Sequence, residues 1–327
     1  MQDAENQPLS ESTLENSQKA EKLAEPEIES PHSLWFNHPT LGAIGRFLLF
    51  MFLVRIVFIP LVFAGIRPFR QAIESALGDI GEALLLGCVL LGTFIMAKLE
   101  RRSFFDYGLR DRRAIPNLVN GIVVGFFSLT LMLLGLRVAR DFYFGPQHMH
   151  GSELLTAALL NIVGFALVAL LEETAFRGYA LYTLTDGIRF WPAAVIMSLL
   201  FAWEHVQNPG ESKIGILAVF AFGIMLAFSI WRTGSLLWAV GFHFAWDYAE
   251  TFIYGVPDSG FVSPQHLLSA RFTGPAWITG GSVGPEGSCF IFLVLAVVTL
   301  VIHFAYPLPK FQEVLISQRS RAEHRRD

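Results

Sequence analysis

The chain has 327 residues, of which 53% are hydrophobic and only 16% are charged. Soluble domains usually carry about a quarter charged residues, so this composition indicates a membrane protein rather than a soluble globular one. The formal net charge is only −4 because acidic and basic residues are segregated along the chain, and nothing in their distribution predicts nucleic-acid binding. Cys88 and Cys289 both lie in apolar runs, so no disulfide framework is expected.

The two ends differ from the middle of the chain. Residues 1–36 are rich in acidic side chains and contain no apolar stretch able to form a core, which predicts a disordered acidic tail. They also lack a basic flank followed by an apolar run, so we expect no signal peptide. Residues 37–308 are predicted to form a single transmembrane domain, and residues 309–327 a basic tail.

Apolar stretches of about 20 residues, the length that spans a bilayer as a helix, recur through the domain. Eight candidates are present: 41–66, 77–97, 117–137, 153–176, 190–206, 214–231, 235–251 and 288–307. The fifth and seventh are short and carry histidines. The sequence therefore predicts an all-α polytopic membrane protein, a bundle of about eight transmembrane helices.

Basic residues in the short connections predict the orientation of the bundle. They gather between the second and third spans and again after the last span: Lys98, Arg101, Arg102, Arg110, Arg112, Arg113, Lys310, Arg319, Arg321, Arg325 and Arg326. With both groups on the cytoplasmic side, the N- and C-termini are cytoplasmic and the 252–287 connection lies outside. We expect a multi-pass protein of a bacterial inner (plasma) membrane, in contact with membrane lipid.

Three charges, Glu172, Glu173 and Arg177, occur at the end of the fourth apolar stretch. An ionised side chain at the centre of a membrane helix costs about 2.5–3.5 kcal/mol, so three unpaired charges would cost on the order of 8 kcal/mol. Glu173 and Arg177 are four residues apart with the acid first, the favourable order for a helical ion pair. Glu172 lies about 100° around the helix and is left available. We expect one structural acid beside one working acid.

Two other apolar stretches supply partners for this acid. His205 ends the fifth stretch, and His243 and Asp247 lie one turn apart in the seventh. Ionisable residues inside a membrane are candidates for a functional site. A carboxylate with two imidazoles can activate water and stabilise an oxyanion. The sequence gives no distances, so their meeting in one bundle is a hypothesis.

Three motifs on these stretches resemble a known family. "EETAFR" at 172–177 matches EExxxR, "FAWEH" at 201–205 matches FxxxH, and "HFAWD" at 243–247 matches HxxxN/D. In this order they resemble the CPBP intramembrane proteases, which include the type II CAAX prenyl endopeptidases and are also called the abortive-infection family. The resemblance covers roughly residues 150–251, and "RSFFDYGLR" and "GGSVGPEGS" extend it loosely.

The resemblance implies an eight-helix glutamate-type intramembrane endopeptidase. It implies that Glu172 and His205 activate a water that attacks the peptide directly, and that His243 and Asp247 stabilise the oxyanion. Glu173 and Arg177 would support the site. The family's asparagine can donate a hydrogen bond, whereas an ionised Asp247 can only accept one. Asp247 is therefore expected either to orient His243 or to be protonated.

Several alternatives stay open. Zinc catalysis is one, because glutamate and histidine are also zinc ligands, although HExxH is absent; our expectation is no cofactor and no metal. A non-catalytic membrane scaffold or immunity protein and an ion-coupled transporter are others. The expected substrate is a membrane-associated peptide or protein, with or without a prenyl group. We also expect the helix that carries Glu172 to continue past Leu184, which places Glu172 deeper.

Overall fold

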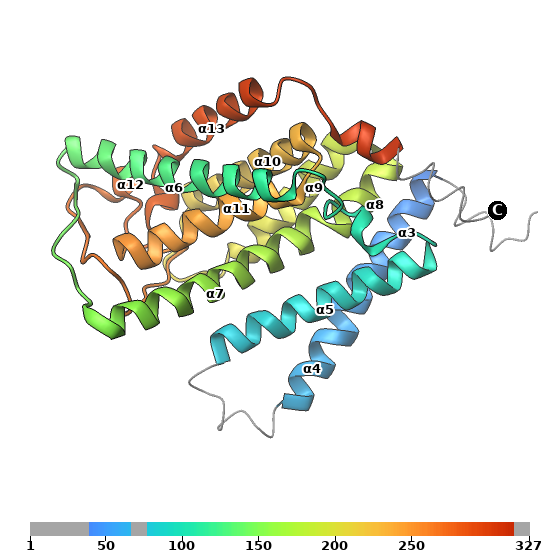
Figure 1. Ribbon diagram of the computed structural model, residues 1–327, viewed down its shortest axis with the longest axis horizontal. Coiled ribbons are helices and arrows are strands. Elements are labelled where there is room, and N and C mark those ends of the chain that lie inside the picture. The colour runs from blue at the N-terminus through green and yellow to red at the C-terminus, as the bar shows by residue number, and fades with distance from the viewer. Residues whose placement is uncertain (1–38, 67–76, 317–327) are drawn as a thin grey trace, which may run out of the picture.

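The structure is a computed structural model that describes residues 39–66 and 77–316 (Figure 1). The predicted acidic tail falls outside the described residues, as does most of the predicted basic tail. In chain order the elements are α3 (Pro39–Met51), η1 (Phe52–Phe58), α4 (Ile59–Ile66), α5 (Leu77–Leu99), η3 (Phe104–Asp106), α6 (Ala114–Val138), β1 (Phe142–Tyr143), α7 (Gly151–Arg177), α8 (Tyr179–Ile188), α9 (Phe190–His205), α10 (Lys213–Thr233), α11 (Leu236–Asp247), η4 (Tyr248–Tyr254), β2 (Arg271–Phe272), α12 (Ala276–Thr279), η5 (Pro285–Gly287) and α13 (Ile291–Ala305).

The protein is an all-α polytopic membrane protein, as predicted. All eight predicted stretches are helical. Among the described residues, five helical segments are long and apolar enough to cross a membrane: Thr40–Gly65, Ile80–Leu99, Ala114–Val138, Gly151–Ile188 and Lys213–Thr233. The other three stretches correspond to the shorter helices α9, α11 and α13.

The helix that carries Glu172 does continue past Leu184. It runs from Gly151 to Ile188, with one interruption at Gly178 that separates α7 from α8. The Gly178 backbone, with φ −83° and ψ −125°, leaves the helical region for a single residue. The motif residues of α7 therefore lie ahead of this break.

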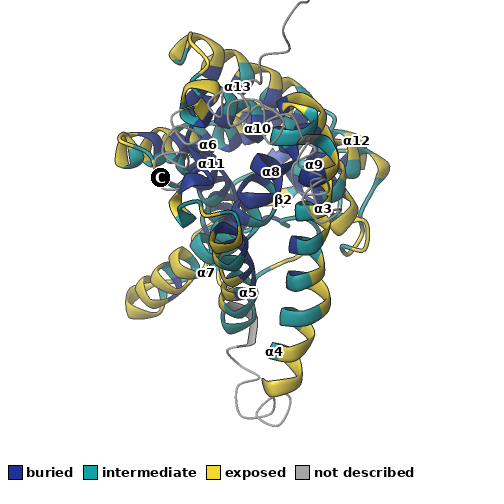
Figure 2. Cartoon of the chain, turned by 90° about the vertical axis from the view of Figure 1, so that its right-hand side faces the viewer, coloured by how far each residue is buried: buried dark blue, intermediate teal, exposed yellow. Residues whose placement is uncertain are grey.

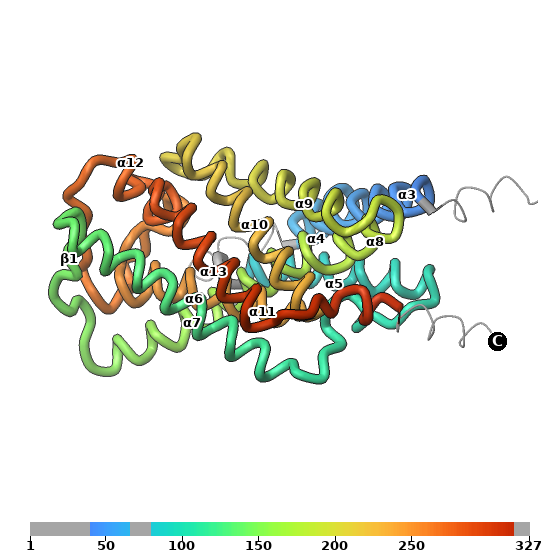
Figure 3. Tube along the Cα trace, turned by 90° about the horizontal axis from the view of Figure 1, so that it is seen from above, coloured from blue at the N-terminus to red at the C-terminus, as the bar shows by residue number. Residues whose placement is uncertain are grey.

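Helix α11 is at the centre of the bundle, where it packs on α6, α7 and α10 (Figures 1 and 3). Ten of its 12 residues are buried. Its contact with α6 is close because both helices carry glycine there. A Cβ atom at Gly125 would lie 2.4 Å from the Phe242 carbonyl oxygen, and one at Gly241 would lie 2.3 Å from the Leu118 carbonyl oxygen. Small residues of this kind let membrane helices approach backbone to backbone.

The first two apolar segments form the periphery. Helix α4 and the lower end of α5 project from the rest of the bundle; α4 is largely exposed, whereas that end of α5 is mostly half-buried (Figure 2). Two arginines of the first segment form ion pairs with the rest of the bundle. Arg46 lies 3.6 Å from Glu100, and Arg55 lies 2.5 Å from Glu204, in the last turn of α9.

The bundle also extends beyond the predicted domain boundary at residue 308. Phe311 is fully buried and packs against Tyr182 and Phe190, with ring centroids 4.9 and 4.6 Å apart. Residues 311–316 are helical. The packed part of the chain therefore includes the start of the segment that the sequence assigned to a basic tail.

A long connection after α11 folds back over one end of the bundle. It follows the π-helical turn η4. Backbone hydrogen bonds, such as the one that Leu267 N donates to Phe252 O, join it to that turn. Its strand β2 pairs antiparallel with β1, with Phe142 opposite Phe272. This connection, residues 255–287, is therefore an ordered wall next to α7 and α11.

Candidate active site

The last turn of α7 holds the acid pair that the sequence singled out. Glu173 and Arg177 are almost fully buried, and Arg177 Nη1 donates to Glu173 Oε1 at 2.9 Å. This confirms the predicted ion pair. Glu172, the neighbouring acid, keeps 26% of its side chain exposed. The guanidinium of Arg177 also lies over the ring of Phe201, 4.2 Å from its centroid, which stabilises a cation that is out of reach of water.

His243 joins α11 to both glutamates. Its Nδ1 lies 2.9 Å from Glu173 Oε1, a hydrogen bond between two buried groups. Because Glu173 is ionised and paired with Arg177, it accepts, and Nδ1–H of His243 donates. The other ring nitrogen, Nε2, lies 3.6 Å from Glu172 Oε2 and 3.5 Å from Asp247 Oδ2. Glu173 thus fixes the orientation of the imidazole and turns Nε2 toward the remaining acids.

The sequence left two roles open for Asp247, to orient His243 or to be protonated. Asp247 is 6% exposed and lies beside Nε2 of His243, one helical turn away, at a distance beyond a good hydrogen bond. The short contact that orients His243 comes from Glu173.

His205 approaches from α9. Its Nδ1 lies 2.8 Å from the carbonyl oxygen of Phe201, so Nδ1–H donates and a neutral His205 carries its lone pair on Nε2. The Phe201 ring contacts His205 edge-on at 4.6 Å and lies under Arg177 on its other side. One aromatic residue therefore positions both the α9 histidine and the buried arginine of α7.

The four predicted catalytic residues line one cavity of about 460 Å³: Glu172, His205, His243 and Asp247. Glu173 and Arg177 lie behind it, where they hold His243 and the end of α7. The chain thus brings together residues from three helices that are up to 75 positions apart in the sequence (172 to 247). The geometry does not by itself assign a role to any of them.

Four further acids line the same cavity: Glu82, Glu204, Asp258 and Glu286. Asp258 and Glu286 come from the long connection and from η5, and no motif in the sequence pointed to either. Burial raises the pKa of Asp258 to about 6 and that of Glu286 to about 7, with Asp258 adding to the latter through charge repulsion. A third acid, Glu250, is fully buried in η4. Its position three residues after Asp247 and seven after His243, on one face of an apolar helix, was a signal that could have identified it.

Within the described residues, one set of three side chains has ligand atoms close enough together to share a metal ion. It is made of Glu250, Asp258 and Glu286, whose carboxylate oxygens lie within 4.8 Å of one another. The set includes none of the motif residues.

Fold and site together define a class: a helical integral membrane protein with a cavity of about 460 Å³ where carboxylates and imidazoles from separate helices meet. Residues 154–249, less than a third of the chain, match a protein family described as type II CAAX prenyl endopeptidase Rce1-like. This match supports the resemblance to the CPBP proteases seen in the motifs, and the matched family is one of endopeptidases of the CAAX type. Searches of curated proteins and of solved structures gave no match.

Proposed function

We propose that this protein is an intramembrane endopeptidase that hydrolyses a peptide bond in a membrane-associated peptide or protein, using a water activated by Glu172 and His205. The supporting observation is that Glu172, His205 and His243 line one cavity although they come from three helices. Nδ1 of His205 contacts the Phe201 carbonyl oxygen, which leaves its Nε2 free to accept from water. Nδ1 of His243 contacts Glu173, and its Nε2 faces Glu172.

In the proposed reaction Glu172 takes a proton from the water while Nε2 of His205 accepts the water's other hydrogen bond. The water oxygen attacks the carbonyl carbon of the scissile peptide and forms a tetrahedral oxyanion. His243, protonated on both nitrogens, donates Nδ1–H to Glu173 and Nε2–H to the oxyanion. Glu172 then delivers its proton to the leaving nitrogen, the C–N bond breaks, and a carboxylic acid and an amine are released.

Asp247 and Arg177 have supporting roles in this scheme. Asp247 compensates the charge of His243 from the side of Nε2, at 3.5 Å. Arg177 keeps Glu173 ionised, so that Glu173 can hold His243 in place. Glu173 and Arg177 are therefore positioning residues, because neither lines the cavity.

The substrate is expected to carry an apolar part. Phe261 and Val262 line the cavity and are 59% and 69% exposed, so they form an exposed apolar edge beside its polar interior. A segment inserted in the lipid, or a lipid-modified peptide such as a prenylated CaaX sequence, matches this combination. We further propose that the protein works in a bacterial inner membrane with both termini cytoplasmic, in contact with lipid, and without a cofactor.

The test compares cleavage of a prenylated CaaX peptide with cleavage of the same peptide lacking the prenyl group, using full-length protein in lipid nanodiscs. Glu172→Gln and His205→Ala should each abolish cleavage, while the surface control Glu153→Gln should cleave at the wild-type rate. Folding is checked by the melting temperature of each variant. Cleavage retained by Glu172→Gln would refute the mechanism, and failure of the wild type to cleave either peptide would refute the substrate class.

Zinc catalysis predicts a different response to chelators. A zinc-selective chelator should leave the rate unchanged if a water activated by Glu172 is the nucleophile. Loss of activity that zinc alone restores would replace this mechanism by a metal-dependent one.

A further inference from the structure

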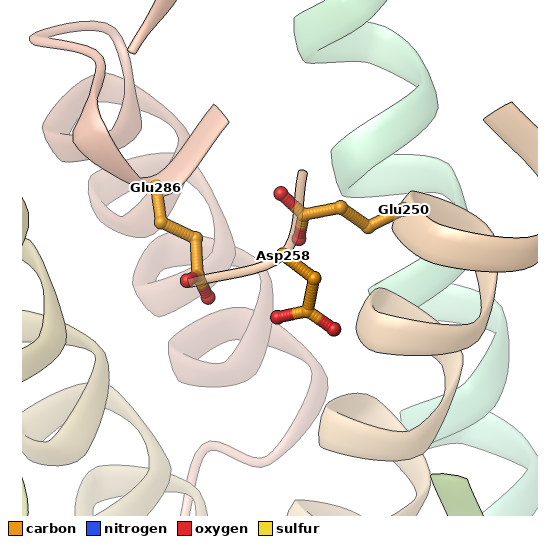
Figure 4. A group of neighbouring side chains, drawn as sticks. All are labelled: Glu250, Asp258 and Glu286. Carbon is orange, nitrogen blue, oxygen red and sulfur yellow. The ribbon is translucent and has the colours of Figure 1, made fainter. Parts of the chain in front are cut away.

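A second cluster of acids lies next to the cavity and takes no part in the proposed hydrolysis. Glu250, Asp258 and Glu286 come from η4, from the turn that follows it and from η5, respectively. Figure 4 shows Glu250 and Glu286 reaching in from two sides with Asp258 between them. Their oxygens lie within 4.8 Å of one another, although like charges at such a distance repel.

Glu250 is the member that requires an explanation. Its side chain is fully buried, and neither carboxylate oxygen accepts a hydrogen bond of good geometry among the described residues, although the Trp246 indole one turn earlier lies near it. Burying an ionised carboxylate without a partner is strongly unfavourable, and buried polar groups in proteins are almost always paired. The carboxylate points into the cluster, so its missing partner belongs there.

The other two acids are held in place by hydroxyl donors. Thr251 Oγ1 donates to Asp258 Oδ2 at 3.1 Å, and Ser259 Oγ donates to Glu286 Oε2. Within the described part of the chain, no lysine or arginine forms an ion pair with any of the three acids. The cluster is therefore oriented by neutral groups, and the basic side chains that act on its acids are the site histidines His205 and His243.

The backbone around the cluster is built for close approach. Gly284, at φ +101°, adopts a conformation that other residues rarely reach. A Cβ atom there would lie 1.9 Å from the Pro257 carbonyl oxygen and 3.1 Å from Glu250 Oε1. In addition, Gly260 N donates to Val283 O at 2.9 Å. These contacts bring the segment before η5 against the turn that holds Asp258.

We propose that Glu250, Asp258 and Glu286 bind one divalent cation, and that Ca²⁺ is the cation that fits. Hard carboxylate oxygens select Ca²⁺ and Mg²⁺ over zinc. Ca²⁺ accepts oxygens at about 2.3–2.6 Å in a flexible geometry, whereas Mg²⁺ demands a near-ideal octahedron at about 2.0–2.1 Å. Three carboxylates on separate segments, with ligand oxygens within 4.8 Å of one another, therefore suit Ca²⁺ better than Mg²⁺. Water completes the shell.

The bound cation would join three segments of the cavity wall. Asp258 and Glu286 line the cavity. Through the cation they would be joined to Glu250 in η4, the helical turn that continues α11. The ion is thus a structural clamp on residues 255–287, distinct from the water-activating residues. It does not depend on the proposed protease mechanism.

The experiment measures Ca²⁺ binding and thermal unfolding of the full-length protein in detergent after removal of metals with EGTA. We expect one Ca²⁺ per chain and a rise in melting temperature on adding Ca²⁺, with a smaller response to Mg²⁺. Glu250→Gln should weaken Ca²⁺ binding at least tenfold. The exposed acid Glu153, in the first turn of α7, provides the matched control, and Glu153→Gln should bind as the wild type does.

The order of melting temperatures distinguishes a cation site from three acids that share protons. In EGTA, Glu250→Gln should melt at or above the wild type, because it removes one ionisable group from a buried cluster of acids. In Ca²⁺ the order should reverse. If Glu250→Gln does not fold, Asp258→Asn, which is only partly buried, is used for the same comparison. A folded wild type that binds no Ca²⁺, or variants that bind it as tightly as the wild type, would overturn the proposal.

Discussion

Replacing Glu173 by leucine isolates the part of the site that depends on buried charge. The substitution introduces an apolar side chain of similar size and removes the acceptor of both Arg177 and His243. Arg177, at 1% exposure, then keeps its contacts with the rings of Phe176 and Phe201 but loses its carboxylate partner. Breaking a buried ion pair by removing one partner costs about 3–5 kcal/mol.

The second variant removes both charges. Glu173→Leu combined with Arg177→Met leaves two apolar side chains where the pair was, and such replacements are often neutral or stabilising. We therefore expect the double variant to recover most of the 3–5 kcal/mol lost in Glu173→Leu. Cleavage should not recover, because Nδ1 of His243 still has no acceptor and the ring is free to turn.

The assay is thermal unfolding in detergent, paired with peptide cleavage in nanodiscs. A loss of about 3 kcal/mol corresponds to a fall of about 4 °C in melting temperature for a chain of this length. A surface substitution such as Glu153→Gln should change stability by less than about 0.5 kcal/mol. The reasoning is refuted if Glu173→Leu melts with the wild type, or if the double variant is no more stable than Glu173→Leu.

Two further predictions concern packing and pH. Gly125→Leu should destabilise the protein by several kcal/mol, because the new side chain would collide with the Phe242 carbonyl oxygen. Gly135→Ala, on the same helix with nothing within 4 Å of the added atom, should be neutral or stabilise by up to about 1 kcal/mol; equal melting temperatures for the two variants would contradict this account. In EGTA, stability should fall as pH rises from about 4 to 7. Folding raises the pKa of Asp258 from 3.8 to about 6 and that of Glu286 from 4.5 to about 7, so the folded state binds more protons in this range. This contribution is fully present below pH 4 and is lost above pH 7, and a melting temperature that climbs over the same range in EGTA would show the sign to be wrong.

Local features of the site could be predicted from the sequence because they depend on one helix at a time. The Glu173–Arg177 pair follows from a four-residue spacing, and the structure has it at 2.9 Å. Glu172 could be separated from this pair because it lies about 100° around the helix from Glu173. The positions of the helices followed from apolar length, although α9 and α11 are shorter than a membrane span.

Contacts between helices could not be predicted in the same way. The hydrogen bond from His243 to Glu173 depends on the depth at which α11 packs on α7, and glycine contacts between α11 and α6 contribute to that depth. The sequence suggested Asp247 as one candidate to orient His243, from its spacing alone, because the partner on another helix was not visible. Asp258 and Glu286 were missed for the same reason, since the path of an irregular connection sets where they lie.

The charges around the cavity connect the two proposed sites. No lysine or arginine lines the cavity in the described part of the chain, and the nearby Arg177 is committed to Glu173. An oxyanion that forms there would be repelled by the acids of the cation site if no cation were bound. A unit charge about 10 Å away contributes about 1.7 kcal/mol at an effective dielectric constant of 20, which is more than tenfold in rate. Removing Ca²⁺ should therefore slow cleavage above pH 7, where Asp258 and Glu286 are ionised, and in EGTA the variant Asp258→Asn should cleave faster than the wild type because it carries one negative charge fewer. Equal rates in EGTA would mean that the cluster stabilises the wall of the cavity without influencing the reaction through its charge.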